Sequence, residues 1–283
     1  MDFNVIEVPN LNSFAGLLMT AKFVKNWYSL LILYSTLIPK VTIRFRDGEQ
    51  VTIYKRNKES NIKLQGGFAF PQGTLTWLQN SLNFDKFYEF LYKRYLIDKG
   101  FQYGTDDIVT LTPMNLKIKI FKPYSFVLDE VFIMRVYGEP DLKGRTVIDI
   151  GASIGDSSLY FSKLGAEMVY AYEMDSERYN LARQNIKMNK LDERIKIFNI
   201  AANSELLDSI ILQNNLSNVF LKLDCEGCEY QIFSEIDKRA LERVNDVVME
   251  YHKDPSILMM RLKDHGFHVK KKGTLIFGNR KSE

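Results

Sequence analysis

The nine residues KLDCEGCEY, Lys222–Tyr230, bring together several side chains that can do chemistry. Three are carboxylates, which can accept a proton or hold a ligand: Asp224, Glu226 and Glu229. Asp224 directly follows the apolar run VFLKL, and Glu226 lies two residues further on, so both can face the same side of a strand end. We predict that these acids line a crevice, with Gly227 permitting the turn into a helix.

The chain's only cysteines, Cys225 and Cys228, lie inside this stretch in C-x-x-C spacing. Such a pair can form a redox-active disulfide or give two of the four ligands of a zinc site. The chain has no second cysteine pair, and its only other candidate ligands of this kind are His252, His265 and His268. We therefore interpret the cysteines as small, buried or half-buried side chains, with zinc and a disulfide as less favoured alternatives.

A second polar pair, Glu250 and His252, follows the apolar run DVVM and lies on one face of its strand end. An imidazole titrates near neutrality, so His252 is the best candidate for a general base that Glu250 could orient. The predicted catalytic residues are His252, Asp224, Glu226 and Glu250. Alternatively, Asp224, Glu250 and His252 could together hold a divalent metal; this alternative is not favoured, and no metal ligand is assigned.

The segment VIDIGASIGD, residues 147–156, has the pattern of a strand, a tight glycine turn and a helix. Gly151 and Gly155 would let the backbone approach a ligand closely. Ser153 replaces the middle glycine of the dinucleotide-binding fingerprint. Asp149, expected to point into the crevice, would repel a pyrophosphate but suits the positive methionine part of S-adenosylmethionine. Glu173 ends the next strand, where it can bind both ribose hydroxyls.

The elements that must position these residues are short apolar runs, most of them separated by helical segments. The runs are TVIDIG, MVYAYE, IKIFNIA, VFLKLD, DVVMEY, FHVKK and TLIFGN. Strands that alternate with helices predict a mostly parallel sheet, and the last two runs are close enough to form an antiparallel hairpin. This α/β arrangement is that of class I methyltransferases, with a Rossmann-like sheet of seven strands. We predict this domain over residues 137–283 and an N-terminal α+β domain over residues 1–136, for substrate selection or dimerisation.

The motifs DIGASIGD and KLDCEGCEY, together with VVMEYH, resemble those of the FkbM family of S-adenosylmethionine-dependent methyltransferases. The resemblance covers roughly residues 126–283, and in that family the positions of Cys225 and Cys228 vary. It implies S-adenosylmethionine as cofactor and O-methylation of a hydroxyl on a sugar or small polar metabolite. The predicted cofactor-binding residues are Asp149, Gly151, Ala152, Ser153, Gly155, Glu173, Met174, Asn199 and Asp224.

The net charge of +3 gives no global attraction for nucleic acid, although Lys40–Lys63, with an Asp47-Gly48 hairpin signal, has four more basic than acidic residues. We therefore expect a small-molecule or glycan hydroxyl acceptor and consider nucleic acid unlikely. A tRNA base methyltransferase and a non-catalytic protein that keeps the fold are the alternatives. The apolar segment Trp27–Ile38 is too short to span a bilayer, so we expect a cytoplasmic protein. Peripheral membrane contact and a homodimer are further possibilities.

Overall fold

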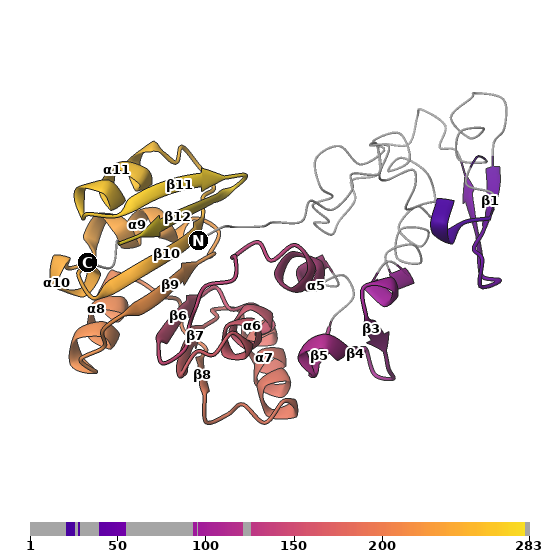
Figure 1. Cartoon of the computed structure of the whole chain (residues 1–283), viewed down its shortest axis with the longest axis horizontal. Helices are drawn as coiled ribbons and strands as arrows, with labels where there is room; N and C mark the ends of the chain where they lie inside the picture. The colour runs from indigo at the N-terminus through magenta and orange to yellow at the C-terminus, as the bar shows by residue number, and fades with distance from the viewer. Residues whose placement is uncertain are drawn as a thin grey trace. The chain divides into compact units, whose positions relative to one another are not determined.

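The computed structural model of the protein describes residues 21–25, 28, 40–54, 93–94, 96–120 and 126–280 (Figure 1). The chain divides into two compact units, one over residues 6–102 and a larger one that takes in residues 103–283. The predicted apolar segment Trp27–Ile38, apart from Tyr28, lies outside the described residues. Within the described part of the chain, no helix combines the length and apolarity needed to cross a membrane.

The smaller unit contains the hairpin that the sequence predicts. Strands β1 (Lys40–Arg44) and β2 (Gln50–Tyr54) pair in antiparallel register around the turn at Asp47 and Gly48. Gly48 has a φ of +101°, which glycine adopts without steric cost. Alternate side chains are buried along both strands, as a two-residue period requires when one face packs against apolar groups. The hairpin prediction is confirmed.

The larger unit is built on a seven-stranded mixed sheet with the order β11-β12-β10-β9-β6-β7-β8. Its strands are β6 (Thr146–Ile150), β7 (Met168–Tyr172), β8 (Ile195–Phe198), β9 (Val219–Leu223), β10 (Val244–Glu250), β11 (His268–Lys272) and β12 (Leu275–Asn279). The five strands β6 to β10 are parallel, whereas β12 pairs antiparallel with β10 and with β11. This is the class I methyltransferase fold, as the sequence predicts.

Helices cover both faces of this sheet, which explains why its central strands are apolar on both sides (Figure 1). Ile148 and Ile150 of β6 join a core cluster with the helices of one face, which are α8 (Ser204–Gln213), α9 (Cys228–Glu235), α10 (Lys238–Leu241) and α11 (Ser256–Asp264). Helices α6 (Asp156–Lys163) and α7 (Ser176–Met188) cover the other face. The parallel strands therefore all end at one edge, where the connecting loops meet.

The larger unit begins earlier in the chain than the predicted boundary at residues 136/137. Strands β3 (Phe101–Tyr103), β4 (Ile108–Leu111) and β5 (Leu116–Lys119) form a small sheet, and β4 and β5 belong to the larger unit. The amide groups of Asn185 and Asn189 on α7 hydrogen-bond the backbone N–H and C=O of Lys119 and Lys117, respectively. These bonds attach β5 to α7. The turn η1 (Thr112–Met114) joins β4 to β5, and α5 (Phe126–Leu128) and a π-helical turn, η2 (Asp129–Ile133), lie between β5 and β6.

Candidate functional site

The glycine turn after β6 meets the end of β9 closely. A Cβ atom on Gly151 would lie 1.8 Å from the carbonyl oxygen of Asp224, and Gly151 has a φ of +76°. Only glycine fits there without moving one of the two loops. The N–H groups of Gly151 and Ala152 both donate to the carbonyl oxygen of Tyr172 at the end of β7. Three strand ends are thereby fixed around one point of the sheet edge.

Asp149 does not face an open crevice, contrary to the sequence-based expectation. Its side chain is fully buried, and its Oδ2 accepts hydrogen bonds from the hydroxyls of Ser157 and Ser158 at 2.7 and 2.6 Å. Its Oδ1 lies 3.0 Å from Nζ of Lys222, which is 1% exposed and also donates to the carbonyl oxygen of Gly151 at 2.7 Å. Both faces of β6 are covered, so the carboxylate supports the glycine turn from beneath.

Glu173 fixes the opposite side of the turn. Its Oε2 accepts the N–H of Ser153, and its Oε1 accepts the N–H of Asp175, both at 2.8 Å. Asn199, after β8, donates to the carbonyl oxygens of Glu173 and Met174. The loops that follow β7 and β8 are therefore tied together, and the predicted cofactor residues Glu173, Met174 and Asn199 do lie side by side.

This sheet edge fits the cofactor that the sequence predicts. The glycine turn offers the close backbone approach that a bound nucleoside derivative needs, and Glu173 ends β7 beside it. Asp156, at the start of α6, is buried, and its Oδ1 has no hydrogen-bond partner among the described residues. Burial raises the pKa of Asp156 to about 7. A cationic ligand group nearby would satisfy this carboxyl.

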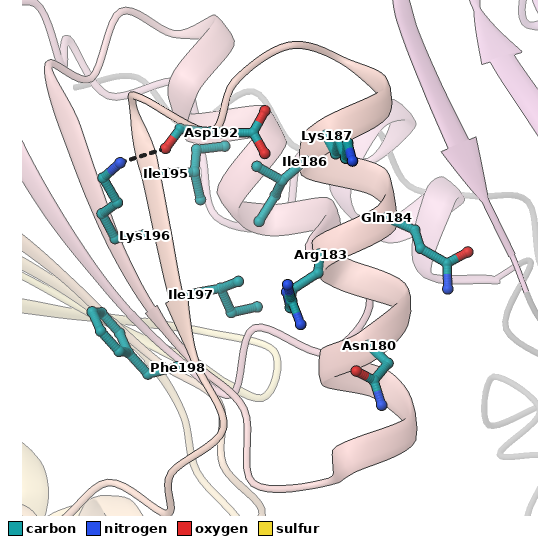
Figure 2. Close-up of a pocket in the computed structure, with 10 residues that line it drawn as sticks. All are labelled: Asn180, Arg183, Gln184, Ile186, Lys187, Asp192, Ile195, Lys196, Ile197 and Phe198. Atoms are coloured by element: carbon teal, nitrogen blue, oxygen red, sulfur yellow. Dashed lines mark hydrogen bonds between the residues drawn. The ribbon is translucent and has the colours of Figure 1, made fainter.

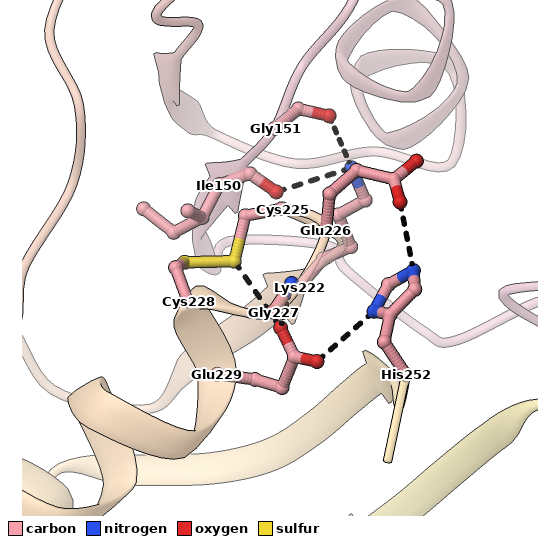
Figure 3. Close-up of a disulfide and its surroundings, with 9 residues drawn as sticks. All are labelled: Ile150, Gly151, Lys222, Cys225, Glu226, Gly227, Cys228, Glu229 and His252. Atoms are coloured by element: carbon pink, nitrogen blue, oxygen red, sulfur yellow. Dashed lines mark hydrogen bonds and ion pairs between the residues drawn. A yellow bond between two sulfur atoms is a disulfide. The ribbon is translucent and has the colours of Figure 1, made fainter.

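His252 lies at the same edge, held by a buried acid (Figure 3). Its Nδ1 is 3.0 Å from Oε1 of Glu229, whose side chain is fully buried, and its Nε2 is 3.2 Å from Oε2 of the exposed Glu226. Burial alone would lower the pKa of His252, but the hydrogen bond and charge of Glu229, with Glu226 and Glu250, raise it above its usual value. When Nδ1–H donates to Glu229, Nε2 is the nitrogen that can take up a proton.

Asp224 and Glu250 form the acidic part of the site. The hydroxyl of Tyr137 donates to Oδ2 of Asp224 at 2.6 Å. Burial, and then the neighbouring charge of Asp224, raises the pKa of Glu250 to about 7. Burial opposes ionisation of Asp224 as well, but the charge of Lys222 and the Tyr137 hydrogen bond hold the pKa of Asp224 below its usual value. Of the two acids, Asp224 is therefore the one that ionises more readily.

Ligand atoms of Asp224, Glu250 and His252 all lie within 4.8 Å of one another, as the metal alternative requires. In the described structure these groups also have hydrogen-bonding and charge partners of their own, which are Tyr137, Lys222, Glu226 and Glu229. Asp224, Glu250 and His252 therefore have the side-chain types of a divalent-metal site. Their hydrogen bonds to neighbouring residues also suit a site that transfers a proton.

The sequence did not favour a disulfide, but the structure contains one. Cys225 and Cys228, both half-buried as predicted, form a disulfide across the turn that leads into α9, with their Cα atoms 5.5 Å apart (Figure 3). The Sγ of Cys225 lies 3.5 Å from Oε2 of Glu229, and that oxygen also accepts the N–H of Gly227. The disulfide thus closes the turn that carries the acid behind His252.

Sequence reasoning brought His252, Asp224, Glu226 and Glu250 together correctly but missed three of their partners. Glu229 rather than Glu250 makes the short contact with the imidazole, whose distance to Glu250 is 3.9 Å. Tyr137 lies 87 residues from Asp224 along the chain, so no local pattern links them. Lys222 left a signal: a lysine inside the otherwise apolar strand VFLKL is buried, and a buried ammonium needs an acid.

Comparison with known proteins gives one family match. A family model described as ribosomal protein L11 methyltransferase (PrmA) matches residues 129–228. The ribosomal protein L11 methyltransferase of Thermoanaerobacter pseudethanolicus is 37% identical over 86 residues, covering 30% of this chain and 28% of the relative. The match thus spans little more than a quarter of that relative's length.

Two solved structures share the fold at low sequence identity. The METTL16 methyltransferase domain is 18% identical, with a TM-score of 0.46, and the match covers 70% of this chain and 93% of that one. A putative RNA methyltransferase from Pyrococcus horikoshii is 20% identical, with a TM-score of 0.35, and the match covers 49% of this chain and 73% of that one. Similarity at this level concerns the fold and carries no argument about activity.

The larger unit therefore has the class I methyltransferase fold, and its residues 129–228 match the model of ribosomal protein L11 methyltransferases. The motifs that resemble the FkbM family and the model that matches point to this same broader class, and the finer FkbM assignment is not shown. The expectation of a small-molecule or glycan hydroxyl acceptor, with nucleic acid unlikely, is contradicted. The family model that matches and the relative described above are both named for methylation of a ribosomal protein, which is a macromolecule.

Proposed function

We propose that the protein transfers a methyl group from S-adenosylmethionine to a nitrogen of a macromolecule, and that this nitrogen is an amine of a ribosomal protein. The observation that carries the proposal is the acidic site around His252. Asp224, Glu226 and Glu250 surround the one imidazole that a buried acid orients. A site of this charge attracts a cationic amine and repels a phosphate.

The residues of the site would prepare the acceptor for attack. An amine is protonated at neutral pH and must lose a proton before its lone pair can attack. Bound S-adenosylmethionine supplies an activated methyl group. His252 would take the proton at Nε2, while Glu229 holds Nδ1–H and stabilises the imidazolium that results. The charge on Asp224, fixed by the hydroxyl of Tyr137, would hold the acceptor nitrogen at the edge of β9.

The matching family supports an acceptor of this class, because the model over residues 129–228 is that of ribosomal protein L11 methyltransferases. The first hundred residues lie outside that match, so the choice of acceptor protein is expected to differ. RNA base methylation is the second candidate. It is favoured by the exposed Lys40, Arg44 and Arg46 on the hairpin of the smaller unit.

The experiment offers both acceptors at once. Ribosomes, free ribosomal proteins and bulk tRNA are each incubated with the protein and with S-adenosylmethionine labelled on the methyl group. Label that protease releases, and nuclease does not, is the expected result. Label released only by nuclease selects the RNA alternative. Label found solely in dialysable metabolites, or no transfer although S-adenosylhomocysteine binds, would reject a macromolecular acceptor.

The His252→Ala variant is the control for this experiment. It should keep its affinity for S-adenosylhomocysteine, because no cofactor residue is changed, and lose transfer to whichever acceptor is labelled. The Gly151→Ala variant should lose cofactor binding, and with it all transfer, because its added Cβ would strike the carbonyl oxygen of Asp224.

A further inference from the structure

A groove lies on the outer edge of the sheet, away from the site around His252. One wall is helix α7 and the other is strand β8, which ends the sheet and pairs only with β7 among the described strands (Figure 2). The groove has a volume of about 700 Å³. We call it the α7–β8 groove.

The α7 wall presents hydrogen-bond donors at regular spacing. Asn180, Arg183, Gln184 and Lys187 line the groove, and they occupy positions i, i+3, i+4 and i+7 of one helix. Side chains at such positions share a face, with neighbouring Cβ atoms about 5–6 Å apart. All four are exposed, and each can donate from nitrogen. A row of this kind can reach successive phosphates along one extended strand.

Charge and apolar surface in the groove are also those of a nucleic-acid site. Arg183 and Lys187 on α7 outnumber the single acidic lining residue, Asp192; the third basic lining residue, Lys196, lies 3.8 Å from Glu193. Ile195 and Ile197 point toward α7, whereas the ring of Phe198, which is 37% exposed and stacks on Tyr172, projects from the other side of β8 (Figure 2). Proteins that bind single strands combine a positive groove along the backbone with aromatic rings on which bases stack.

We propose that the α7–β8 groove binds the phosphodiester backbone of a single-stranded nucleic acid, a role separate from the proposed methyl transfer. An acidic peptide added to the edge of β8 is the competing occupant. Figure 2 shows Arg183 projecting from α7 toward Ile197, beside the edge strand β8. The row of nitrogen donors on α7 matches the phosphates of a nucleic-acid backbone, so we favour the nucleic acid over the peptide.

The groove also leads toward the cofactor residues. Phe198 is followed by Asn199, which donates to the carbonyl oxygens of Glu173 and Met174. A strand held along α7 would therefore end beside the rim of the cofactor site. A nucleic acid bound in the α7–β8 groove would hold the protein on a ribonucleoprotein, and this nucleic acid would not enter the acidic site around His252.

The test uses the full chain and three fluorescent probes: a twelve-residue oligouridine RNA, the matching oligothymidine DNA and a poly-glutamate peptide. Arg183→Glu with Lys187→Glu should weaken binding of the nucleic acids at least tenfold. The slope of log affinity against log salt should become shallower by about 1.4, because two phosphate contacts are lost. Equal affinity for RNA and DNA would show recognition of the backbone alone, and tighter RNA binding would identify RNA as the source.

Lys263→Glu with Lys270→Glu is the matched control, because it changes net charge equally at exposed lysines elsewhere in the domain. It should bind within twofold of the unmodified protein. Both variants should retain affinity for S-adenosylhomocysteine and their melting temperature; Arg183→Gln with Lys187→Gln replaces the first variant if that one melts early. Unchanged nucleic-acid affinity in the groove variant, or poly-glutamate binding as tight as RNA, would overturn the proposal.

Discussion

Two pairs, each of an acid and a basic side chain, lie near the same edge of the sheet but differ in what surrounds them. Asp149 and Lys222 are both buried, and Nζ of Lys222 is also engaged by the carbonyl oxygens of Ile150 and Gly151. Glu229 is equally buried, but its partner His252 has a side chain that is 27% exposed. The Nε2 of His252 faces Glu226, whose side chain is 82% exposed.

The difference separates a pair that supports the site from a pair that can act. A buried pair whose donors are all used has no group left for a substrate, and removing one partner leaves an uncompensated charge. A pair that keeps one titrating atom at the surface can exchange a proton while its buried partner fixes the geometry. Substitutions in the first pair should therefore cost stability, and those in the second should cost turnover.

The largest effect is expected from Lys222→Met. The methionine fills a similar volume but leaves the Asp149 carboxylate buried without its cation, so the free energy of unfolding should fall by about 3–5 kcal/mol. Urea unfolding at pH 7 measures this. The double variant Asp149→Asn with Lys222→Met removes both charges and should recover most of the loss. A single variant that is as stable as the unmodified protein would contradict the supporting role of this pair.

His252→Ala should spare the fold and remove the base. We expect turnover to fall by roughly 10²–10⁴, the range for loss of a general base, while affinity for S-adenosylhomocysteine stays unchanged. Methyl transfer at saturating cofactor and acceptor, with calorimetry for the cofactor, measures the two quantities. Its loss of unfolding free energy should be smaller than that of Lys222→Met, because Glu229 still accepts the N–H of Gly227. A turnover unaffected by the change would eliminate His252 as the base.

Glu229→Gln tests whether the buried acid tunes the imidazole. The pKa of His252 should fall, because the hydrogen bond and charge of Glu229 are the largest influences that raise it. NMR titration of the ring protons measures this without any acceptor. A raised pKa gives stability that is fully present below the unfolded value, about 6.5, and is lost as pH rises through the folded value. The variant should therefore lose less unfolding free energy over that interval.

The control for this titration is Glu226→Gln. Glu226 is exposed, so water screens its charge and the pKa of His252 should shift less than in Glu229→Gln. Equal shifts of the His252 pKa in the two variants would mean that the burial of Glu229 does not strengthen its effect on the imidazole.

The sequence predicted the sheet because a parallel strand covered on both faces is mostly apolar, and the central runs TVIDI and VFLKL have this pattern apart from Asp149 and Lys222. The same property misled the placement of Asp149. When both faces of a strand are covered, the alternation of side chains does not tell which face meets a ligand. The larger unit begins before the predicted domain boundary for another reason: β5 is attached through Asn185 and Asn189 by tertiary hydrogen bonds, which leave no local pattern.

Residues of the site that end neighbouring parallel strands were predictable, because such strands end at one edge whatever the loops between them do. Asp224, Glu250 and His252 are of this kind. The Glu229 contact was not, because it depends on how far α9 turns after Gly227, whose φ is +116°. The sequence does not determine the φ of Gly227, and it therefore does not show that Glu229 is the acid that orients His252.

The smallest effect is expected from Cys225→Ala with Cys228→Ala. The disulfide closes a loop of only four residues, for which the chain-entropy contribution is about 2 kcal/mol at most. Glu229 keeps the N–H of Gly227 and the imidazole of His252 as partners, so the pKa of His252 should move less than in Glu229→Gln. NMR titration and urea unfolding, each with and without a dithiol reductant, measure the two effects. The reductant should reproduce the double variant in the unmodified protein and change nothing in the variant itself. If reduction instead abolishes methyl transfer while the cofactor still binds, the disulfide contributes to turnover, as Glu229 and His252 do, and not only to stability, as Asp149 and Lys222 do.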